Sequence, residues 1–265
     1  MKPPKIVIVG AGSLEFSARL TADCLSYPAL SSAQFALVDI DPERLEFAGR
    51  IFDQICIRGG YDAKATLHQE VSEALPGADF VITSILVGGF EAIQAEIDIP
   101  HRYGVSQAIG DTLTPGGIMR CLRTLPVQAS IAQSVMEHCP NALVLNYTNP
   151  MAMLCEGMMN AAPGINLVGL CHSVQNTTKE WAARLGLEYR SIEFACAGLN
   201  HQAWITRFTS KGRDLLPKIR ALATREDIWR SDTSRMEYVK HFGFPVTEAS
   251  GHNSEYSDRK STRLN

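Results

Sequence analysis

The order of segments at the N-terminus constrains the fold most strongly, because a short apolar run leads directly into two glycines. Residues 5–9 (KIVIV) are predicted to form a buried parallel strand. Gly10-Ala11-Gly12 then turns the chain into a helix predicted over about 14–26, and a second strand over 35–39 ends in an acidic residue. This succession of strand, tight turn, helix and strand is typical of an α/β protein.

Strands and helices alternate through most of the chain. Asp41-Pro42 predicts the start of a helix that runs to about Arg58, because aspartate is a favourable N-cap and proline suits the first turn. Further strands are predicted over 64–67, 79–85, 142–146, 166–170 and 192–197, and further helices over 126–137, after Asn149-Pro150 and over 174–185. This order predicts a Rossmann-like, doubly wound and mostly parallel sheet.

Composition excludes several classes of function. The chain has 265 residues with 45% hydrophobic content, which is enough for a large core. Its formal net charge of -3 offers no basic surface for nucleic acid or for a membrane. Seven scattered cysteines indicate free thiols in a reducing cytosol, and a first strand beginning at Lys5 leaves no room for a targeting segment. We therefore expect a cytoplasmic protein with a small-molecule substrate.

The glycine turn predicts a dinucleotide site. Gly10, Ala11 and Gly12, with Ser13, would let the backbone approach a pyrophosphate at the N-terminus of the helix. The third glycine of the usual fingerprint is replaced by Glu15, so the turn alone is also compatible with an unrelated α/β protein. Asp39 at the end of the second strand can bind the ribose hydroxyls and favours NAD over NADP, although it can also be a capping or solvated acid.

A second candidate site lies later in the chain, where soft or borderline metal ligands follow predicted strands. Cys171 follows the strand over 166–170, and His201 follows the strand over 192–197. Each residue alone is more often structural, a buried thiol or a satisfied histidine, but together at adjacent strand ends they predict a divalent metal site. His172 is an alternative ligand. Mixed nitrogen and sulfur ligation suits Mn, Fe, Co, Ni or Zn.

Other polar residues are weaker candidates. Asp111 can be a general acid or a turn aspartate, and Arg120 can orient a sugar hydroxyl or pair with an acid. Asn149 can bind substrate hydroxyls or initiate the helix that starts near Pro150. Tyr256 lies in a polar segment with Glu248, His252 and Glu255, and it could be a base only if a cation lowered its pKa from about 10.

Six short motifs follow one another along the chain: GAGS at 10–13, GDTLTPGGIMR at 110–120, LNYTNPMAM at 145–153, GLCHSVQ at 169–175, GLNH at 198–201 and VTEASGHNSEY at 246–256. Taken together, these motifs resemble glycoside hydrolase family 4, the NAD- and metal-dependent glycosidases. The CHSVQ string resembles the α-galactosidase branch. Activity on an α-glucoside or an α-uronide is the alternative within the same family.

The resemblance implies an unusual route to hydrolysis, and this family is an exception to catalysis by two carboxylates. NAD takes a hydride from sugar C3, a base removes the acidified C2 proton, the aglycone leaves, water adds and the hydride returns. A divalent metal, for which manganese is the first choice, stabilises the enediolate oxygens.

The resemblance also assigns site residues. Cys171 and His201 match the metal ligands, and Asn149 matches a substrate-contacting asparagine. Apart from that match, Arg120 and His172 are expected as further substrate contacts. Asp111 stands where some members carry the acid for the leaving group, and Tyr256 lies near the region that supplies the base.

The domain organisation follows from a change of pattern after about Ala203. An alternating strand over 204–208 is followed by helical, charge-rich sequence to Lys240. We expect an NAD-binding domain over 1–200 and the beginning of a second α+β substrate or oligomerisation region over 201–265, with a non-native tail from about 257. Family members continue further, and their full-length form is expected to be a homo-oligomer.

Two other classes of protein stay open on the sequence. A malate- or lactate-type dehydrogenase shares the Rossmann half and has no need for Cys171. A truncated fragment that retains NAD and catalyses nothing is the non-enzymatic alternative.

Overall fold

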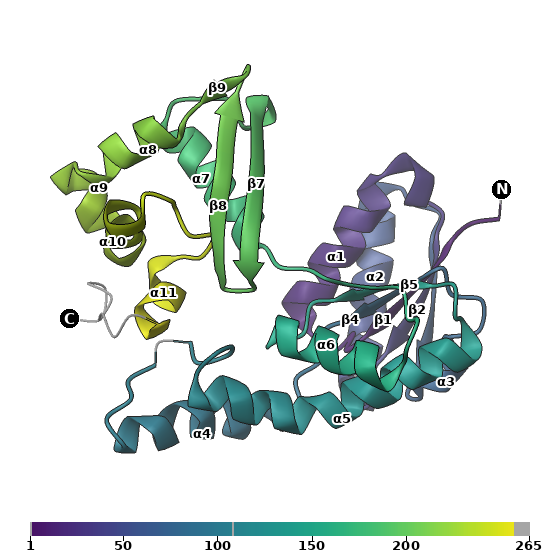
Figure 1. Cartoon of the computed structure of the whole chain (residues 1–265). Coiled ribbons are helices and arrows are strands. Elements are labelled where there is room, and N and C mark those ends of the chain that lie inside the picture. Colours follow the sequence, from purple (N-terminus) through teal and green to yellow (C-terminus); the bar gives the residue numbers. More distant parts are fainter. Residues whose placement is uncertain (1, 108, 257–265) are drawn as a thin grey trace. The chain divides into compact units, whose positions relative to one another are not determined.

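The computed structural model describes residues 2–107 and 109–256, and its contacts group the chain into two compact units (Figure 1). The first unit comprises Met1–Gly89 and Cys121–Leu170, and the second comprises Phe90–Arg120 and Cys171–Asn265. The non-native tail expected from about residue 257 lies outside the described residues. As a boundary between functional domains, the expected division at residue 200 stays a prediction.

The first unit contains the predicted Rossmann-like parallel sheet. Its strands lie in the order β3-β2-β1-β4-β5-β6, and every neighbouring pair is parallel. The strands are β1 (Lys5–Val9), β2 (Gln34–Val38), β3 (Lys64–His68), β4 (Phe80–Thr83), β5 (Leu143–Asn146) and β6 (Leu167–Gly169). The helices of this unit are α1 (Leu14–Ser26), η1 (Pro28–Leu30), α2 (Pro42–Gly59), α3 (Val71–Ala74), α6 (Met151–Ala161) and most of α5 (Pro115–His138).

Both faces of the central strands β1, β2 and β4 are buried, as the apolar residues 6–9 of β1 predict. Successive side chains of a strand point to opposite faces. Ile6 and Ile8 accordingly pack into one hydrophobic cluster, whereas Val7 and Val9 pack into another. Helices therefore cover the sheet on each side, which leaves the carboxyl ends of the strands for binding.

Two helix starts test the capping arguments. α2 begins as predicted, and the Asp41 carboxylate accepts hydrogen bonds from the backbone N–H groups of Glu43 at 3.0 Å and Arg44 at 3.1 Å. The helix expected over 126–137 is present within α5, but its predicted start was wrong, because the helix begins at Pro115 and contains Pro126 in its interior. Its buried residues Ile131 and Val135 pack in the core, and this tertiary contact outweighs the single backbone hydrogen bond that Pro126 removes.

The second unit is built on an antiparallel sheet, in the order β7-β8-β9 (Figure 1). The strands are β7 (Ile192–Leu199), β8 (Gln202–Ser210) and β9 (Arg213–Asp214), and the helices are α4 (Gly89–Arg102), α7 (Ser173–Arg184), η2 (Tyr189–Ser191), α8 (Leu216–Ala223), α9 (Glu226–Ser231), α10 (Thr233–Phe242) and α11 (Ser250–Tyr256). Their core includes the fully buried side chains of Trp181, Ile205, Phe208, Ile219 and Met236.

The strand expected over 192–197 does not extend the parallel sheet, and this correction changes the origin of His201. β7 and β8 are separated by only two residues, Asn200 and His201, so the connection is a hairpin turn and the strands must pair antiparallel. His201 therefore lies in a hairpin turn, with a φ of 63°.

Among the described helices, none has the length and hydropathy that crossing a membrane requires.

Candidate functional site

The glycine turn of the first unit is held against the end of β2. The N–H groups of Gly10 and Ala11 both donate to the carbonyl oxygen of Val38, at 2.9 and 3.0 Å. A Cβ atom on Gly10 would lie 2.1 Å from the Ser84 carbonyl oxygen, and Gly10 has a φ of +91°. Glycine is thus required at this position by both space and backbone conformation.

Asp39 closes the same turn. Its Oδ2 atom accepts a hydrogen bond from the Gly12 N–H at 2.7 Å, and its Oδ1 atom accepts one from the Asp41 N–H at 3.0 Å. A Cβ on Gly12 would lie 2.6 Å from that Oδ2 atom. Ser13, the N-cap residue of α1, makes no side-chain capping hydrogen bond. A turn that contains two glycines, followed by a helix N-terminus without a side-chain cap, fits a dinucleotide phosphate. The binding roles of Gly10 to Ser13 and Asp39 stay predictions.

Cys171 and His201 approach each other in the second unit. The Cys171 Sγ atom, in the segment between β6 and α7, lies 3.4 Å from His201 Nε2. The His201 side chain is only 4% exposed, so its two ring nitrogens face protein groups. The two predicted ligands therefore lie within reach of one ion.

Glu248 adds an oxygen donor to this pair. Its Oε2 atom lies 3.4 Å from His201 Nε2 and accepts a hydrogen bond from the Ser173 hydroxyl at 2.5 Å. Ser173 Oγ in turn lies 2.9 Å from Cys171 Sγ. One ligand atom each from Cys171, His201 and Glu248 lie within 4.8 Å of one another.

A second group of side chains lies on the other side of the His201 ring. Thr112 Oγ1 lies 2.7 Å from His201 Nδ1, and Asp111 Oδ1 lies 3.5 Å from the same nitrogen. The ring of His252 stacks on that of His201 with centroids 4.2 Å apart. His252 also connects the two carboxylates, because its Nε2 lies 3.4 Å from Asp111 Oδ1 and its Nδ1 lies 3.3 Å from Glu248 Oε1.

This packing changes the proton affinity of every ionisable group in the cluster. Burial raises the pKa of the Cys171 thiol, yet hydrogen bonds with His201 and Ser173 outweigh that effect and bring the pKa down to about 7. Burial lowers the pKa of His201, but the surrounding Asp111, Cys171 and Glu248 raise it to about 10.

The pKa values of the two carboxyl groups are lowered, and the pKa of His252 is raised. Burial favours the protonated form of Asp111, but His201 and His252 hold the pKa of this carboxyl well below its usual range. Burial also opposes ionisation of Glu248, and His252 and Ser173 nonetheless lower its pKa. The pKa of His252 rises to about 9, because Asp111 and Glu248 outweigh its burial.

These donors fit a divalent cation of borderline softness. A thiolate, an imidazole nitrogen and a carboxylate oxygen suit Mn, Fe, Co, Ni or Zn. The carboxylates of Asp111 and Glu248 lie beside His201 and His252, whose pKa values are raised. A bound cation would therefore displace protons from these histidines. Cys171, His201 and Glu248 are thus the residues that would hold the metal.

The remaining predicted residues occupy different surroundings. Arg120 forms a salt bridge with the buried Glu96, at 2.8 Å from its Nε to Glu96 Oε2. His172 is exposed at the N-cap of α7, and Asn149 precedes a cis peptide bond to Pro150 in the first unit. Tyr256 ends α11 and lines a cavity of about 440 Å³ together with Thr114 and Gln202. The roles assigned to these residues stay predictions.

Four residues of the cluster were not among the predicted site residues. Glu248 and His252 were noticed only as part of a polar segment, and Thr112 and Ser173 were not singled out. Their spacing carried a weak signal, because Thr112 and Ser173 stand one and two positions from Asp111 and Cys171. Glu248 and His252 are four residues apart, a spacing that suits one helix face but is common on any helix.

Comparison with known proteins assigns the chain to a family. The family described as "Family 4 glycosyl hydrolase" matches residues 5–187, and its C-terminal domain matches residues 196–264. The chain therefore belongs to family 4 of the glycosyl hydrolases, as the resemblance of its motifs indicated.

Its relatives include α-galactosidases. The chain is 41% identical over 254 residues to an α-galactosidase of Bacillus subtilis (strain 168), across 95% of this chain and 59% of the relative. It is 35% identical over 255 residues to an α-galactosidase of Rhizobium meliloti (strain 1021), across 95% of this chain and 52% of the relative. The chain thus spans little more than half the length of these curated relatives. α-Galacturonidases and an α-glucosidase also match.

A solved structure confirms the fold. A 6-phospho-α-glucosidase from gut microorganisms, crystallised with NAD and Mn2+, superposes with a TM-score of 0.82 at 22% identity. The match covers 97% of this chain and 61% of the other.

Proposed function

We propose that the chain belongs to an α-galactosidase that depends on NAD and on a divalent metal, with manganese as the first choice. The observation that carries the proposal is that Cys171, His201 and Glu248 each bring one ligand atom to within 4.8 Å of the others. It occurs in a chain 41% identical to an α-galactosidase. When bound, NAD would accept a hydride from sugar C3 and return it, and the metal would stabilise negative charge on the C2 and C3 oxygens.

The residues of the chain would divide the remaining work. Gly10, Gly12 and Asp39 hold the turn that approaches the cofactor. Cys171 and His201, with Glu248, present the metal ligands. Because these groups are positioned by the folded chain before substrate arrives, little reorganisation accompanies the reaction.

Proton transfer and sugar binding are assigned to the other predicted residues. Tyr256 is the proposed base at C2, and Asn149, Arg120 and His172 are proposed to bind sugar hydroxyls. An acid role for Asp111 requires its pKa to rise when metal and substrate bind, because His201 and His252 hold the pKa of this carboxyl low.

The complete protein is proposed to work as a homo-oligomer in the cytoplasm on a small α-glycoside. The supporting observation for the compartment is the set of seven cysteines, all of which carry free thiols.

A kinetic experiment tests the activity. The chain is incubated with p-nitrophenyl α-galactoside, NAD and Mn2+, and release of nitrophenol is compared for substrate with hydrogen or deuterium at C2 and C3. We expect slower turnover with the deuterated sugars, and loss of turnover without NAD or with Cys171→Ser. Full activity after exhaustive removal of nucleotide and metal would contradict the proposal.

The same assay separates the alternatives. Faster turnover of an α-galacturonide or an α-glucoside than of the α-galactoside would indicate the substrate class of those relatives within the family. Stoichiometric accumulation of NADH without glycoside cleavage would indicate a dehydrogenase. Binding of NAD by calorimetry, with no hydrolysis of any glycoside, would indicate a nucleotide-binding fragment.

A further inference from the structure

The surroundings of His201 differ on its two ring nitrogens. Nε2 faces the proposed ligands, with Cys171 Sγ and Glu248 Oε2 each at 3.4 Å. Nδ1 faces Thr112 Oγ1 at the short distance of 2.7 Å, whereas Asp111 Oδ1 lies farther from it, at 3.5 Å. A neutral imidazole has one N–H donor and one lone pair, so which nitrogen can bind a metal depends on which one carries the proton.

The hydroxyl of Thr112 has only one proton, and that proton is already used. Thr112 Oγ1 donates to Asp111 Oδ1 at 2.8 Å, and a carboxylate oxygen can only accept. The hydroxyl is therefore left with lone pairs to offer His201 Nδ1, which must be the donor. The chain of hydrogen bonds runs from Nδ1–H to Thr112 and from Thr112 to Asp111. In the neutral ring, which is the form that can bind a metal, the lone pair is then on Nε2, the nitrogen that faces Cys171 and Glu248.

We propose that Thr112 is a positioning residue that transmits the charge of Asp111 to His201, and that this relay keeps Nε2 as the nitrogen available to the metal. The inference rests on the proposed function, because it assigns a role toward the metal of that site. In this arrangement Asp111 acts as a carboxylate that orients a ligand, which is a different use from donating a proton to a leaving group.

Burial makes the relay specific. Thr112 is 2% exposed, Asp111 is 8% exposed and His201 is 4% exposed, so water has little access to replace a lost partner. A metal-binding histidine whose other nitrogen loses its hydrogen-bond acceptor is free to change tautomer or orientation. The loss of such a partner typically costs about 10- to 100-fold in metal affinity.

Three variants test the relay. Thr112→Val keeps the shape of the side chain and removes the hydroxyl, whereas Thr112→Ser keeps the hydroxyl. Thr178→Val is the matched control, because Thr178 is also fully buried in the second unit and its hydroxyl donates to the Val174 carbonyl of its own helix. Binding of Mn2+ alone to the 265-residue chain is measured by calorimetry, with folding of each variant checked by circular dichroism.

We expect about 10- to 100-fold weaker Mn2+ binding for Thr112→Val, and binding close to that of the parent chain for Thr112→Ser and Thr178→Val. A folded Thr112→Val chain that binds Mn2+ as the parent does would overturn the relay. So would a Thr112→Ser chain as impaired as Thr112→Val, because packing of the methyl group would then be the cause.

A second measurement reads the tautomer directly. In the Zn2+-loaded chain labelled with ¹⁵N-histidine, NMR should show His201 with its proton on Nδ1 and its Nε2 bound to the metal. Metal bound through Nδ1 would overturn the relay. If the parent chain binds no Mn2+, or if Cys171→Ser binds it unchanged, the proposed metal site itself fails. Mn2+ binding that is lost in Cys171→Ser but unchanged in Thr112→Val would overturn the relay and leave the proposed metal site intact.

Discussion

Among single side chains, His201 combines features that rarely occur together by chance. It is buried, it has a left-handed φ of 63°, and polar groups face both of its ring nitrogens. A non-glycine residue in this conformation costs of the order of 1 kcal/mol, and such strain clusters at functional sites. The hairpin turn thus places an imidazole where a glycine or asparagine would be easier to accommodate.

The raised pKa of His201 predicts that metal binding releases protons. With a pKa of about 10 both ring nitrogens carry a proton at neutral pH, and Nε2 must lose its proton before it can bind a cation. Affinity for Mn2+ should therefore rise by about tenfold per pH unit for each proton released, over the range below the pKa of His201. Calorimetry in buffers of different ionisation enthalpy measures the number of protons. Heats that are independent of the buffer, with a flat affinity between pH 6 and pH 9, would contradict this expectation.

The same shift acts on folding of the metal-free chain in the opposite direction. Because the pKa of His201 rises from 6.5 to about 10, its stabilising contribution is fully present below pH 6.5 and is lost as pH rises through about 10. Metal affinity and metal-free stability should consequently change in opposite directions across this interval.

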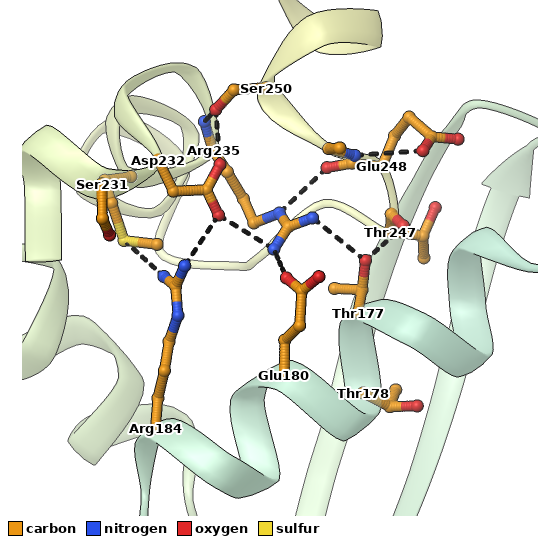
Figure 2. A network of polar contacts seen from close by, with 12 residues as sticks. Thr177, Thr178, Glu180, Arg184, Ser231, Asp232, Arg235, Thr247, Glu248 and Ser250 are labelled. Atoms are coloured by element: carbon orange, nitrogen blue, oxygen red, sulfur yellow. Dashed lines mark hydrogen bonds and ion pairs between the residues drawn. The ribbon is translucent and has the colours of Figure 1, made fainter.

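Among helices and strands, the buried guanidinium of Arg235 joins three parts of the second unit (Figure 2). From α10, its Nε donates to the Glu248 carbonyl oxygen at 2.9 Å, and its Nη1 pairs with Glu180 of α7 at 2.6 Å and with Asp232 at 2.9 Å. Its Nη2 donates to Thr177 at 3.2 Å. Arg235 thereby holds the backbone of Glu248 next to α7, the helix that follows Cys171.

Replacement of Arg235 should destabilise the second unit much more than replacement of an exposed arginine. Arg235→Met removes one donor from the buried Asp232 and one from the Glu248 carbonyl. Removing one partner of a buried pair costs about 3–5 kcal/mol, and we expect a loss near the lower end, because Asp232 keeps its pair with Arg184 at 3.1 Å. Arg230→Met is the matched control. Arg230 pairs with Glu226, and the two side chains are 74% and 70% exposed. Exposed pairs contribute about 0–1 kcal/mol.

Urea unfolding, followed by tryptophan fluorescence, measures the free energy of unfolding of both variants and of the parent chain. Equal losses in the free energy of unfolding for Arg235→Met and Arg230→Met would show that the network in Figure 2 holds little of the unit together.

Across the chain as a whole, each unit has a hydrophobic core of its own. The two clusters on the parallel sheet belong to the first unit, and the cluster around Trp181 belongs to the second. All three tryptophans, Trp181, Trp204 and Trp229, lie in the second unit. Tryptophan fluorescence therefore reports on the unit that contains the proposed metal ligands.

Metal should stabilise the unit that the tryptophans report. Mn2+ at 100 times its dissociation constant should add about 2.7 kcal/mol to the free energy of unfolding, because the ion binds the folded donors and not the unfolded chain. The fluorescence midpoint in urea should rise accordingly. Cys171→Ser should show no rise at the same Mn2+ concentration, and an equal rise in that variant would place the ion elsewhere.

Much of the first unit was predictable from neighbouring residues. The apolar run of β1, the glycine turn and the Asp41 cap of α2 all occur near the predicted positions, because strand burial, turn geometry and capping depend on residues close in sequence. The proline signal failed at α5, where packing of residues such as Val135 decided the outcome.

In the candidate site, too, local sequence predicted some features and long-range packing determined the others. Local pattern identified Cys171 and His201 as possible ligands, since residue type and position after a strand are short-range properties. Long-range packing brought them together with Glu248 and determined which nitrogen of His201 faces Thr112. Ser173 and Glu248, for example, bond across 75 positions of sequence. That contact depends on how the hairpin, α7 and α10 pack, and no pattern of neighbouring residues contains that information.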